Sequence, residues 1–342
     1  MRRVRRSAAT LRRDDGIAEE TPVPPSRIPA DDRPDPQPAH ASEHEVQGSG
    51  QTKPLPPTVR RWAERHIGPV TDVRDASHDW YRSRVWELAG RGGTRWYVKV
   101  SPSLKFFTRE TRAYRHIVPA LGHGRAPHLV DSCAEELAVL LTSVPGVPAP
   151  GLAPTDAQWR NVHRQAGSLC ARLHEAGELD RADRAEAEAS LEAAADGAQE
   201  YLARAGDRLT EDERRVIRDH AAQLRRVGPV PVGYIHGDNQ PRNWLWSPTG
   251  LALVDFERTR PAARVQDLVI LTVTEWLDHP DRGRAFLRSY GRELTGAERH
   301  ALRCLTALDA VDCLAWGPDN DHPEVTARGR RTLDRLMGES AP

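Results

Sequence analysis

Alternating hydrophobic and polar positions mark several short segments in the first half of the chain, which is typical of strands that bury one face. The segments that predict strands are residues 70–77, 83–89, 94–100, 126–132 and 137–142, and they are rich in Val, Trp and Tyr. Residues 91–93, Arg-Gly-Gly, predict a hairpin turn between the second and third of them. Helical spacing predicts a short helix over 59–67 and a longer one over 104–118. We therefore expect a small lobe with an antiparallel sheet over residues 58–143.

The pattern changes to a helical period after residues 144–151, a segment with three prolines and two glycines that predicts a hinge. The expected helices cover 156–176, 181–205, 211–226, 266–278, 282–292, 296–315 and 323–337, with Thr155 or Asp156 as the cap of the first. Short apolar strands are expected at 230–235 and 251–254. The fold class is therefore α+β, with a β-rich N-lobe and a helical C-lobe over residues 152–342, which is the outline of a bilobal kinase.

Residues 1–57 follow neither period. They contain ten of the 27 prolines and no aromatic residue. A segment of this composition cannot bury enough apolar surface to offset the entropy lost on ordering, so we expect disorder. A docking arm built on the arginine pairs is the alternative.

Composition limits the cellular compartment and the classes of partner that we expect. The 49 basic and 49 acidic residues give a formal net charge of zero, so no global field favours nucleic acid or an anionic membrane. Four cysteines without a CxxC pair favour a reduced, cytoplasmic protein, and no apolar run reaches the length of a membrane span. Only three of the 49 basic residues are lysines, which leaves 46 arginines and makes each lysine worth examination.

Polar residues after two of the apolar strands form the most informative pattern. His236-Gly237-Asp238 follows the first strand, Asn243 stands five residues after Asp238, and Asp255 follows the second strand. Phosphoryl transfer from ATP needs a carboxylate that orients an attacking hydroxyl and hard oxygen ligands for Mg²⁺. Alternatively, His236-Gly237-Asp238 could be a plain turn and Asp255 a carboxylate at the end of a strand. Either explanation suits one of these features alone, but not their occurrence together in this order and spacing.

These residues resemble the aminoglycoside phosphotransferase family, which includes choline-kinase-like kinases of small molecules. The family's His-Gly-Asp run, followed by four residues and Asn, is matched residue for residue. The resemblance implies Asp238 as catalytic base, Asn243 and Asp255 as metal ligands, and His236 as the residue that holds the catalytic loop. It also implies ATP, or GTP, and Mg²⁺ as cofactors.

Lys99 lies on the third predicted strand, between two valines, as does the ATP-phosphate lysine of kinases. Glu110 on the next helix resembles the family's carboxylate partner of that lysine. The alternatives are a solvated lysine on an edge strand and an acid that only balances an arginine-rich helix. Lys53 and Lys105 have no comparable context.

Further candidates rest on weaker matches. His174 resembles a family histidine that packs near the catalytic loop, and Asp267 resembles a family carboxylate that steadies this loop. An ordinary helix-end histidine and a helix N-terminal acid are the alternatives. Glu257, two residues after Asp255, could reach the metal through water.

The nucleotide loop departs from the protein-kinase pattern. The first loop between strands, residues 77–83, contains no glycine, which favours a small-molecule kinase over a protein kinase. Ser77, His78 and Ser83 are candidate phosphate contacts. The adenine base would pair with main-chain groups of residues 142–144, at Thr142, Ser143 and Val144.

The sequence says least about which molecule accepts the phosphate. Residues 174–215 contain 13 acidic residues against six arginines, which suits either a polycationic antibiotic or plain solvated helix faces. Candidate cleft residues are Glu275, Asp278, Asp309, Asp312, Trp276 and Trp316. We expect an antibiotic kinase that gives resistance, acting as monomer or homodimer; a metabolic kinase of choline, homoserine or an amino sugar is the alternative. A non-catalytic nucleotide-binding scaffold is a third hypothesis, which the retention of Lys99, Asp238, Asn243 and Asp255 disfavours.

Overall fold

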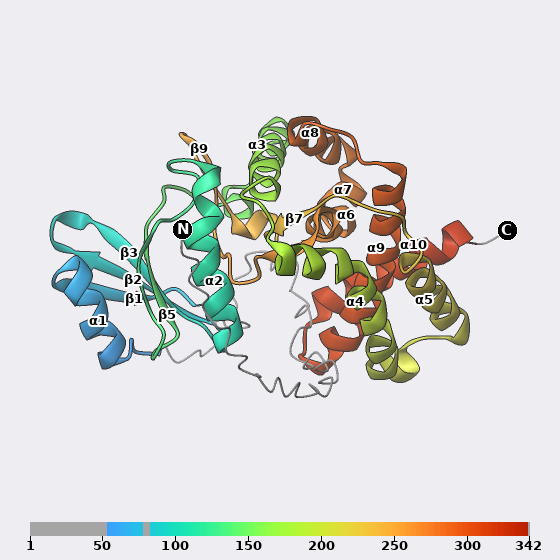
Figure 1. The fold of residues 1–342 in the computed structure, drawn as a ribbon, viewed down its shortest axis with the longest axis horizontal. Coiled ribbons are helices and arrows are strands. Elements are labelled where there is room, and N and C mark those ends of the chain that lie inside the picture. Colours follow the sequence, from blue (N-terminus) through green and yellow to red (C-terminus); the bar gives the residue numbers. More distant parts are fainter. Residues whose placement is uncertain (1–52, 78–82, 341–342) are drawn as a thin grey trace, which may run out of the picture. The chain divides into compact units, whose positions relative to one another are not determined.

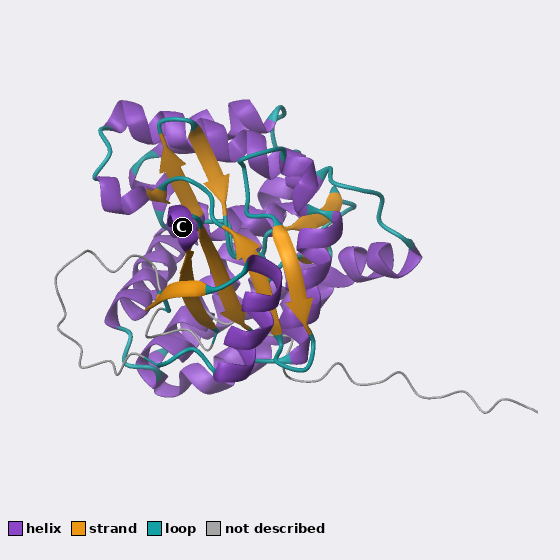
Figure 2. Ribbon diagram, turned by 90° about the vertical axis from the view of Figure 1, so that its left-hand side faces the viewer, coloured by secondary structure: helices purple, strands orange, loops and turns teal. Residues whose placement is uncertain are grey.

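The computed structural model describes residues 53–77 and 83–340, and an antiparallel sheet forms the first part of the fold. Its strands are β1 (Val70–Asp75), β2 (Arg84–Gly90), β3 (Arg95–Val100), β4 (Leu129–Cys133) and β5 (Ala138–Thr142). They lie in the order β1-β2-β3-β5-β4, and Lys99 on β3 pairs with Val85 on one side and Val139 on the other. The predicted α+β fold with an antiparallel N-terminal lobe is confirmed (Figure 2).

The two faces of this sheet are buried by different helices. On one face Val98 and Leu140 pack with Trp62 of α1 (Pro57–Ile67), in a separate small core. On the other face Val139 and Leu141 belong to the main core, which α2 (Leu104–His116) joins. Figure 1 shows α1 and α2 on either side of the sheet. Because side chains alternate along a strand, Lys99 points to the α2 side when Val98 points to the α1 side.

Residues 53–57 belong to this lobe, although the sequence pattern assigned them to the disordered segment. Leu55 is buried in the small core. The main chain of Lys53 donates to Asp75 at 3.1 Å and accepts from the Trp86 indole at 2.9 Å. The remainder of the expected disordered segment, residues 1–52, lies outside the described part of the chain.

The C-terminal region is largely helical and begins after β6 (Val147–Pro148). Its longer helices are α3 (Asp156–His174), α4 (Arg181–Ala205), α5 (Glu211–Leu224), α8 (Pro280–Tyr290), α9 (Gly296–Asp319) and α10 (Pro323–Ser340). Thr155, Thr210 and Thr295 each form a capping box at the start of α3, α5 and α9, which satisfies main-chain donors in the first turn. Within the described residues, no helix is long and apolar enough to cross a bilayer.

Two small sheets position the loops between the lobes. β7 (Val232–Ile235) pairs with β10 (Arg260–Ala263), and β8 (Trp244–Ser247) pairs with β6 and with β9 (Gly250–Leu253). β7 leads into His236, and β9 leads toward Asp255. The sequence pattern predicted β7 and β9 but not the other strands, since β6 has two residues, β8 directly follows the loop at Asn243, and β10 contains a proline.

The helix expected over 266–278 is divided into three pieces. A 3₁₀ turn over Arg264–Leu268 is followed by α6 (Val269–Val273) and α7 (Glu275–Asp278). The break occurs at Thr274, where φ is −110° and ψ is −75°. The hydroxyls of Thr272 and Thr274 donate to carbonyls four residues back, at 2.8 and 2.7 Å. Such back-bonding bends helices and accounts for a break that hydrophobic spacing does not reveal.

We predict that Gly167→Ala destabilises the fold by about 1–3 kcal/mol, through contact between α3 and α8. A Cβ at Gly167 would lie 2.2 Å from the main-chain oxygen of Phe286, which cannot rotate away. The matched control is Gly197→Ala in α4, where the nearest atom is the Tyr201 ring at 3.6 Å. That variant should gain about 0.5–1 kcal/mol from helix propensity. Urea unfolding of the two variants checks the pair, and equal unfolding midpoints would contradict the predicted packing.

Candidate active site

The loop after β7 is fixed by one buried carboxylate, Asp267. Its Oδ2 accepts the main-chain N–H of His236 at 2.7 Å, and its Oδ1 accepts that of Gly237 at 2.8 Å. Its side chain is fully buried, and although burial opposes ionisation, the bond from His174 lowers the pKa of Asp267. An ionised carboxylate therefore holds the backbone just before Asp238, as expected from the sequence.

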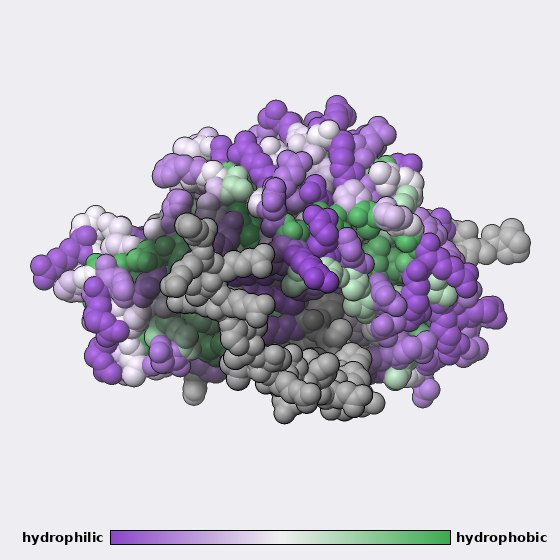
Figure 3. Space-filling view, viewed as in Figure 1, coloured by the Kyte–Doolittle hydropathy of each residue, from purple (hydrophilic) through white to green (hydrophobic). Residues whose placement is uncertain are grey.

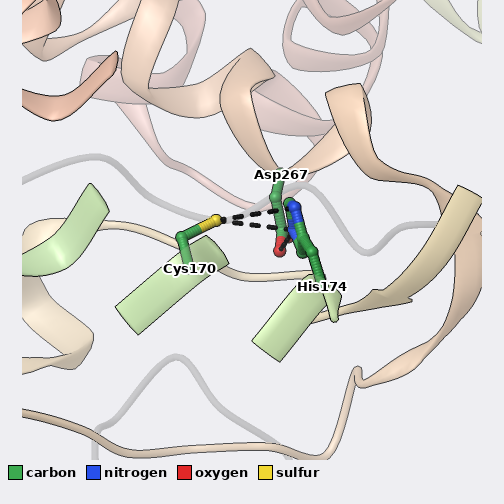
Figure 4. A group of neighbouring side chains, drawn as sticks. All are labelled: Cys170, His174 and Asp267. Atoms are coloured by element: carbon green, nitrogen blue, oxygen red, sulfur yellow. Dashed lines mark hydrogen bonds and ion pairs between the residues drawn. The ribbon is translucent and has the colours of Figure 1, made fainter. Parts of the chain in front are cut away.

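Asp267 is in turn held by a chain of side chains (Figure 4). His174 Nε2 lies 3.0 Å from Asp267 Oδ2. The other ring nitrogen, Nδ1, lies 2.8 Å from the hydroxyl of Tyr290. Cys170 lies one turn earlier on α3, with its sulfur 3.4 Å from His174 Nε2. Burial raises the pKa of Cys170 well above its usual range, so this group is a thiol. The buried cluster of Cys170, His174 and Asp267 is thus a hydrogen-bonded support for the loop.

Gly237 allows the loop to pass close to the chain after Asp255. Its φ is +78°, and a Cβ there would lie 2.5 Å from the carbonyl oxygen of Arg258 and 2.8 Å from Nη1 of Arg260. A side chain at this position therefore has no room. The requirement explains why glycine stands where the protein-kinase signature has arginine.

Among the described residues, three side chains donate to Asp238, which is nearly fully buried. Its Oδ1 accepts the Gln240 amide. Its Oδ2 accepts Arg242 Nη2 at 3.0 Å and Asn243 Nδ2 at 2.6 Å. Donors from neutral and cationic groups favour a carboxylate with a fixed orientation, ready to accept a hydrogen bond from a bound hydroxyl.

His236 links β7 to β9 from inside the protein. Its Nε2 donates to the carbonyl of Val254 at 3.1 Å, and its ring packs on Phe256 with 4.9 Å between centroids. Burial lowers the pKa of His236, which keeps the ring neutral at pH 7. These contacts match the loop-holding role expected from the sequence.

Asn243 and Asp255 lie on adjoining segments, and each has a side-chain oxygen that accepts no bond from the described residues. The main chains are joined by Val254 N–H, which donates to the Asn243 carbonyl at 3.1 Å. The Asn243 amide nitrogen donates to Asp238, and no described residue donates to its Oδ1 or to Asp255 Oδ2. Asp255 has a φ of +69°, a strained value for a non-glycine residue that is typical of functional sites. Hard oxygen donors of this kind fit Mg²⁺.

Lys99 lies among three carboxylates. Its Nζ is 3.2 Å from Glu110, 2.5 Å from Asp255 and 2.8 Å from Glu257. Burial disfavours the ammonium, but Asp255 and Glu110 raise the pKa of Lys99 well above its usual range. Burial likewise opposes ionisation of Asp255, yet Lys99 lowers its pKa to about 2. For Glu110, burial outweighs Lys99 and raises the pKa. The lysine, its helix partner and the metal-type aspartate expected from the sequence are therefore brought together.

The predicted phosphate contacts have different surroundings. Ser83 is buried, and its hydroxyl donates to Glu257 at 2.5 Å. Ser77 is used by the sheet, since its hydroxyl accepts the Val85 N–H at 2.9 Å. His78 lies outside the described residues.

The segment expected to bind adenine follows directly after β5. Thr142 is the last residue of β5; its main-chain N–H donates to the His128 carbonyl at 2.9 Å, and its hydroxyl accepts the His128 N–H at 2.9 Å. Outside the regular elements, no main-chain hydrogen bond between described residues involves Ser143 or Val144. Their amide and carbonyl groups are thus available to a base edge.

A pocket of about 360 Å³ lies between the α6–α8 region and α10. Glu275, Asp278 and Glu324 contribute acids to it, while Arg282 and Arg331 contribute bases. Glu275 and Arg282 are paired at 2.7 Å. Of the other candidate cleft residues, Asp309 pairs with Arg328 at 3.6 Å, Asp312 is buried, Trp276 packs on Phe286, and Trp316 packs on His322.

The acidic stretch over 174–215 forms ordinary helix surfaces. Asp183 is an exception, since it is buried and pairs with Arg112 of α2. Asp196 pairs with Arg225 and Asp212 with Arg215, all at exposed positions. The part of the surface around α5 is strongly hydrophilic (Figure 3). These pairs favour solvated faces over an attraction site for a polycation.

Glu257, expected from the sequence to reach a metal through water, lies 2.8 Å from Lys99 Nζ and accepts the Ser83 hydroxyl at 2.5 Å. Three other residues that support the site were not expected from the sequence. Tyr290 bonds to His174. Gln240 and Arg242 donate to Asp238. The last two lie inside the Asp238–Asn243 run, so their polar character was the available signal.

Comparison with known proteins identifies the family and the fold. Residues 72–305 match the model of the phosphotransferase enzyme family. A thermostable mutant of the aminoglycoside phosphotransferase APH(4)-Ia is similar in structure, with a TM-score of 0.62, 15% identity and coverage of 83% of this chain and 100% of that chain. Another structure of such a mutant, with a TM-score of 0.61, 14% identity and coverage of 83% and 99%, contains ADP and hygromycin B.

Two further structures widen the range of substrates among these neighbours. A macrolide 2'-phosphotransferase from Brachybacterium faecium has a TM-score of 0.55, 18% identity and coverage of 83% of this chain and 98% of that chain. A choline/ethanolamine kinase family protein from Mesorhizobium loti has a TM-score of 0.60, 17% identity and coverage of 83% and 95%. No curated protein sequence matches at a significant level. The chain belongs to the phosphotransferase enzyme family, and it is an ATP-dependent phosphotransferase with the bilobal kinase-like fold.

Proposed function

We propose that this protein transfers the γ-phosphate of ATP to a hydroxyl group of a small molecule, with Asp238 as the base. The observation that carries the proposal is the convergence of Asp238, Asn243, Asp255 and Lys99 from separate elements of both lobes. In-line transfer requires an oriented hydroxyl, a charged anchor for phosphate and oxygen ligands for a metal. Each requirement has a residue in this group.

The proton and charge assignments follow from the contacts. Asp238, held by its three donors, orients the acceptor hydroxyl and accepts its proton. Lys99 exchanges part of its contact with Asp255 for α- and β-phosphate oxygens, while Glu110 keeps its ammonium in place. Asn243 and Asp255 would hold Mg²⁺ through their free oxygens. The bound metal would neutralise charge on the phosphates.

The adenine base, or guanine if GTP is the donor, would pair with main-chain groups of Ser143 and Val144. Ser83 and Ser77 remain proposed neighbours of the phosphates, with Ser83 acting through Glu257.

The acceptor pocket is proposed to be the cavity lined by Glu275, Asp278 and Glu324. α10 connects it to the catalytic loop, because Arg328 on this helix lies close enough to Arg242 to affect its ionisation. The mixture of acidic and basic side chains suits a polar acceptor that carries an amine. We therefore propose an antibiotic acceptor and a role in resistance for a cytoplasmic enzyme.

A second candidate, a metabolic small-molecule kinase, is supported by the choline/ethanolamine kinase family neighbour, whose TM-score of 0.60 is close to those of the antibiotic kinases. An acceptor panel separates the two, since the fold and the site residues are common to both. The panel should contain aminoglycosides, macrolides and nucleoside antibiotics in one arm and choline, ethanolamine, homoserine and amino sugars in the other.

We expect ADP release with at least one panel member and its loss in Asp238→Ala by about 10³-fold or more, because no other group accepts the hydroxyl proton. ADP binding by this variant should stay within about twofold, measured by calorimetry. Asp319→Asn, an exposed acid paired with Arg208, is the matched control and should keep full turnover. Turnover by Asp238→Ala would overturn the assignment, and ADP release at the blank level across the panel would favour the scaffold hypothesis.

Lys99→Arg should lower kcat/KM for ATP by about 10²-fold, although it keeps the positive charge. The planar guanidinium is too wide for a buried position 3.2 Å from Glu110 and 2.8 Å from Glu257. Lys105→Arg on the neighbouring helix α2 is the matched control and should be neutral. Steady-state kinetics with the best acceptor measures both variants. Equal kcat/KM values would show that Lys99 does not position phosphate.

A further inference from the structure

Arg242 shares an oxygen atom with the proposed metal ligand. Asp238 Oδ2 accepts Arg242 Nη2 at 3.0 Å and Asn243 Nδ2 at 2.6 Å. The guanidinium, the carboxylate that would orient the hydroxyl and the residue that would hold the metal therefore lie within two hydrogen bonds of one another. No motif used in the sequence analysis assigns a role to this arginine.

Arg242 is partly exposed beside a carboxylate that is almost fully buried. Its side chain is 20% exposed, against 1% for Asp238. Among the described residues, Asp255 and Glu257 are acids, and Arg258 and Arg328 bases, whose charges act on Arg242. The guanidinium is thus bonded to the proposed base, and the charge of the proposed metal ligand Asp255 acts on it.

The bond from Arg242 to Asp238 brings the guanidinium near the position expected for the γ-phosphate. A hydroxyl bound to Asp238 would lie roughly 3 Å from the carboxylate, with the phosphorus a further roughly 3–3.5 Å away in a reactive complex. We infer that an Arg242 guanidinium bonded to the same carboxylate can reach the equatorial phosphoryl oxygens, where charge spreads in the transition state.

We propose that Arg242 is a catalytic residue that donates hydrogen bonds to the transferred phosphoryl group; this rests on the proposed function. The bond from the acceptor oxygen to γ-phosphorus forms as the bond from γ-phosphorus to the β–γ bridging oxygen breaks. ADP leaves with the electron pair of the broken bond, and the acceptor proton passes to Asp238. Arg242 stabilises the charge on the equatorial oxygens throughout and exchanges no proton.

The competing explanation is that Arg242 only orients Asp238. The two explanations predict different affinities in a binding measurement that involves no proton transfer. Aluminium fluoride bound with ADP and Mg²⁺ imitates the planar phosphoryl group, so an arginine that contacts this group contributes to affinity even without an acceptor. An arginine that acts only through Asp238 does not contribute.

The experiment compares the affinity for ADP and Mg²⁺, with and without aluminium fluoride, by calorimetry. The proteins are the full chain, Arg242→Gln, Arg242→Lys, Asp238→Asn and a control, Arg330→Gln, whose arginine pairs with Glu213 far along the sequence from the loop. Aluminium fluoride should raise wild-type affinity by about 10²-fold or more, and Arg242→Gln should lose at least about tenfold of that gain with ADP affinity unchanged. Asp238→Asn and Arg330→Gln should keep the gain, and Arg242→Lys should keep part of it.

An undiminished gain in Arg242→Gln would overturn the inference, as would a wild-type protein that binds ADP without any gain from aluminium fluoride. A loss of the gain in Asp238→Asn as large as that in Arg242→Gln would also overturn it, because the effect would then pass through Asp238. Absence of ADP binding in the wild type would instead reject the proposed function. Thermal midpoints within about 2 °C of wild type identify folded variants, and Arg242→Lys provides the second variant if Arg242→Gln does not fold.

Discussion

The buried ammonium group of Lys99 joins the two lobes, because its partners come from both of them. Glu110 belongs to α2 of the first lobe, while Asp255 and Glu257 belong to the loop after β9. One cation among three carboxylates leaves an excess of buried negative charge, even though burial raises the pKa of Glu110. Breaking such a group by removing the cation is strongly unfavourable, since the carboxylates lose their partner inside the protein. In the proposed function, the same excess of negative charge attracts a divalent cation, which then holds the nucleotide.

A second constraint, the Asp267 carboxylate, determines where Asp238 lies. Asp267 accepts main-chain hydrogen bonds immediately before Asp238, and the His174–Tyr290 chain holds Asp267 from behind. The loop is therefore held in place by groups buried behind it. Asp255 has a left-handed backbone, a strained conformation that is common at functional sites.

Sequence reasoning could predict those parts of the fold that depend on local spacing. The strands that carry Lys99 and precede His236 alternate clearly, and the predicted limits of α4, residues 181–205, agree with the structure. The resemblance to the kinase family added the grouping of Lys99, Glu110 and Asp255, which the structure brings into contact.

The remaining features depend on contacts between distant segments. β10 forms because Arg260–Ala263 pairs with β7, although its own sequence includes a proline. The break at Thr274 comes from hydroxyl bonds to the preceding turn, and the Ser83–Glu257 bond joins residues that are 174 positions apart. The loop conformation brings Arg242 into contact with Asp238, which the spacing of residues in the sequence does not show.

Thermal unfolding with ATP tests most directly whether a metal-bound nucleotide completes the group formed by Lys99 and its three carboxylates. ATP with Mg²⁺ at roughly a hundred times the dissociation constant should raise the unfolding midpoint by about 5 °C. ATP with excess EDTA should raise it by less than about 1 °C, because the triphosphate then meets carboxylates without an intervening cation. Equal stabilisation with and without the divalent cation, or none in either case, would contradict the account.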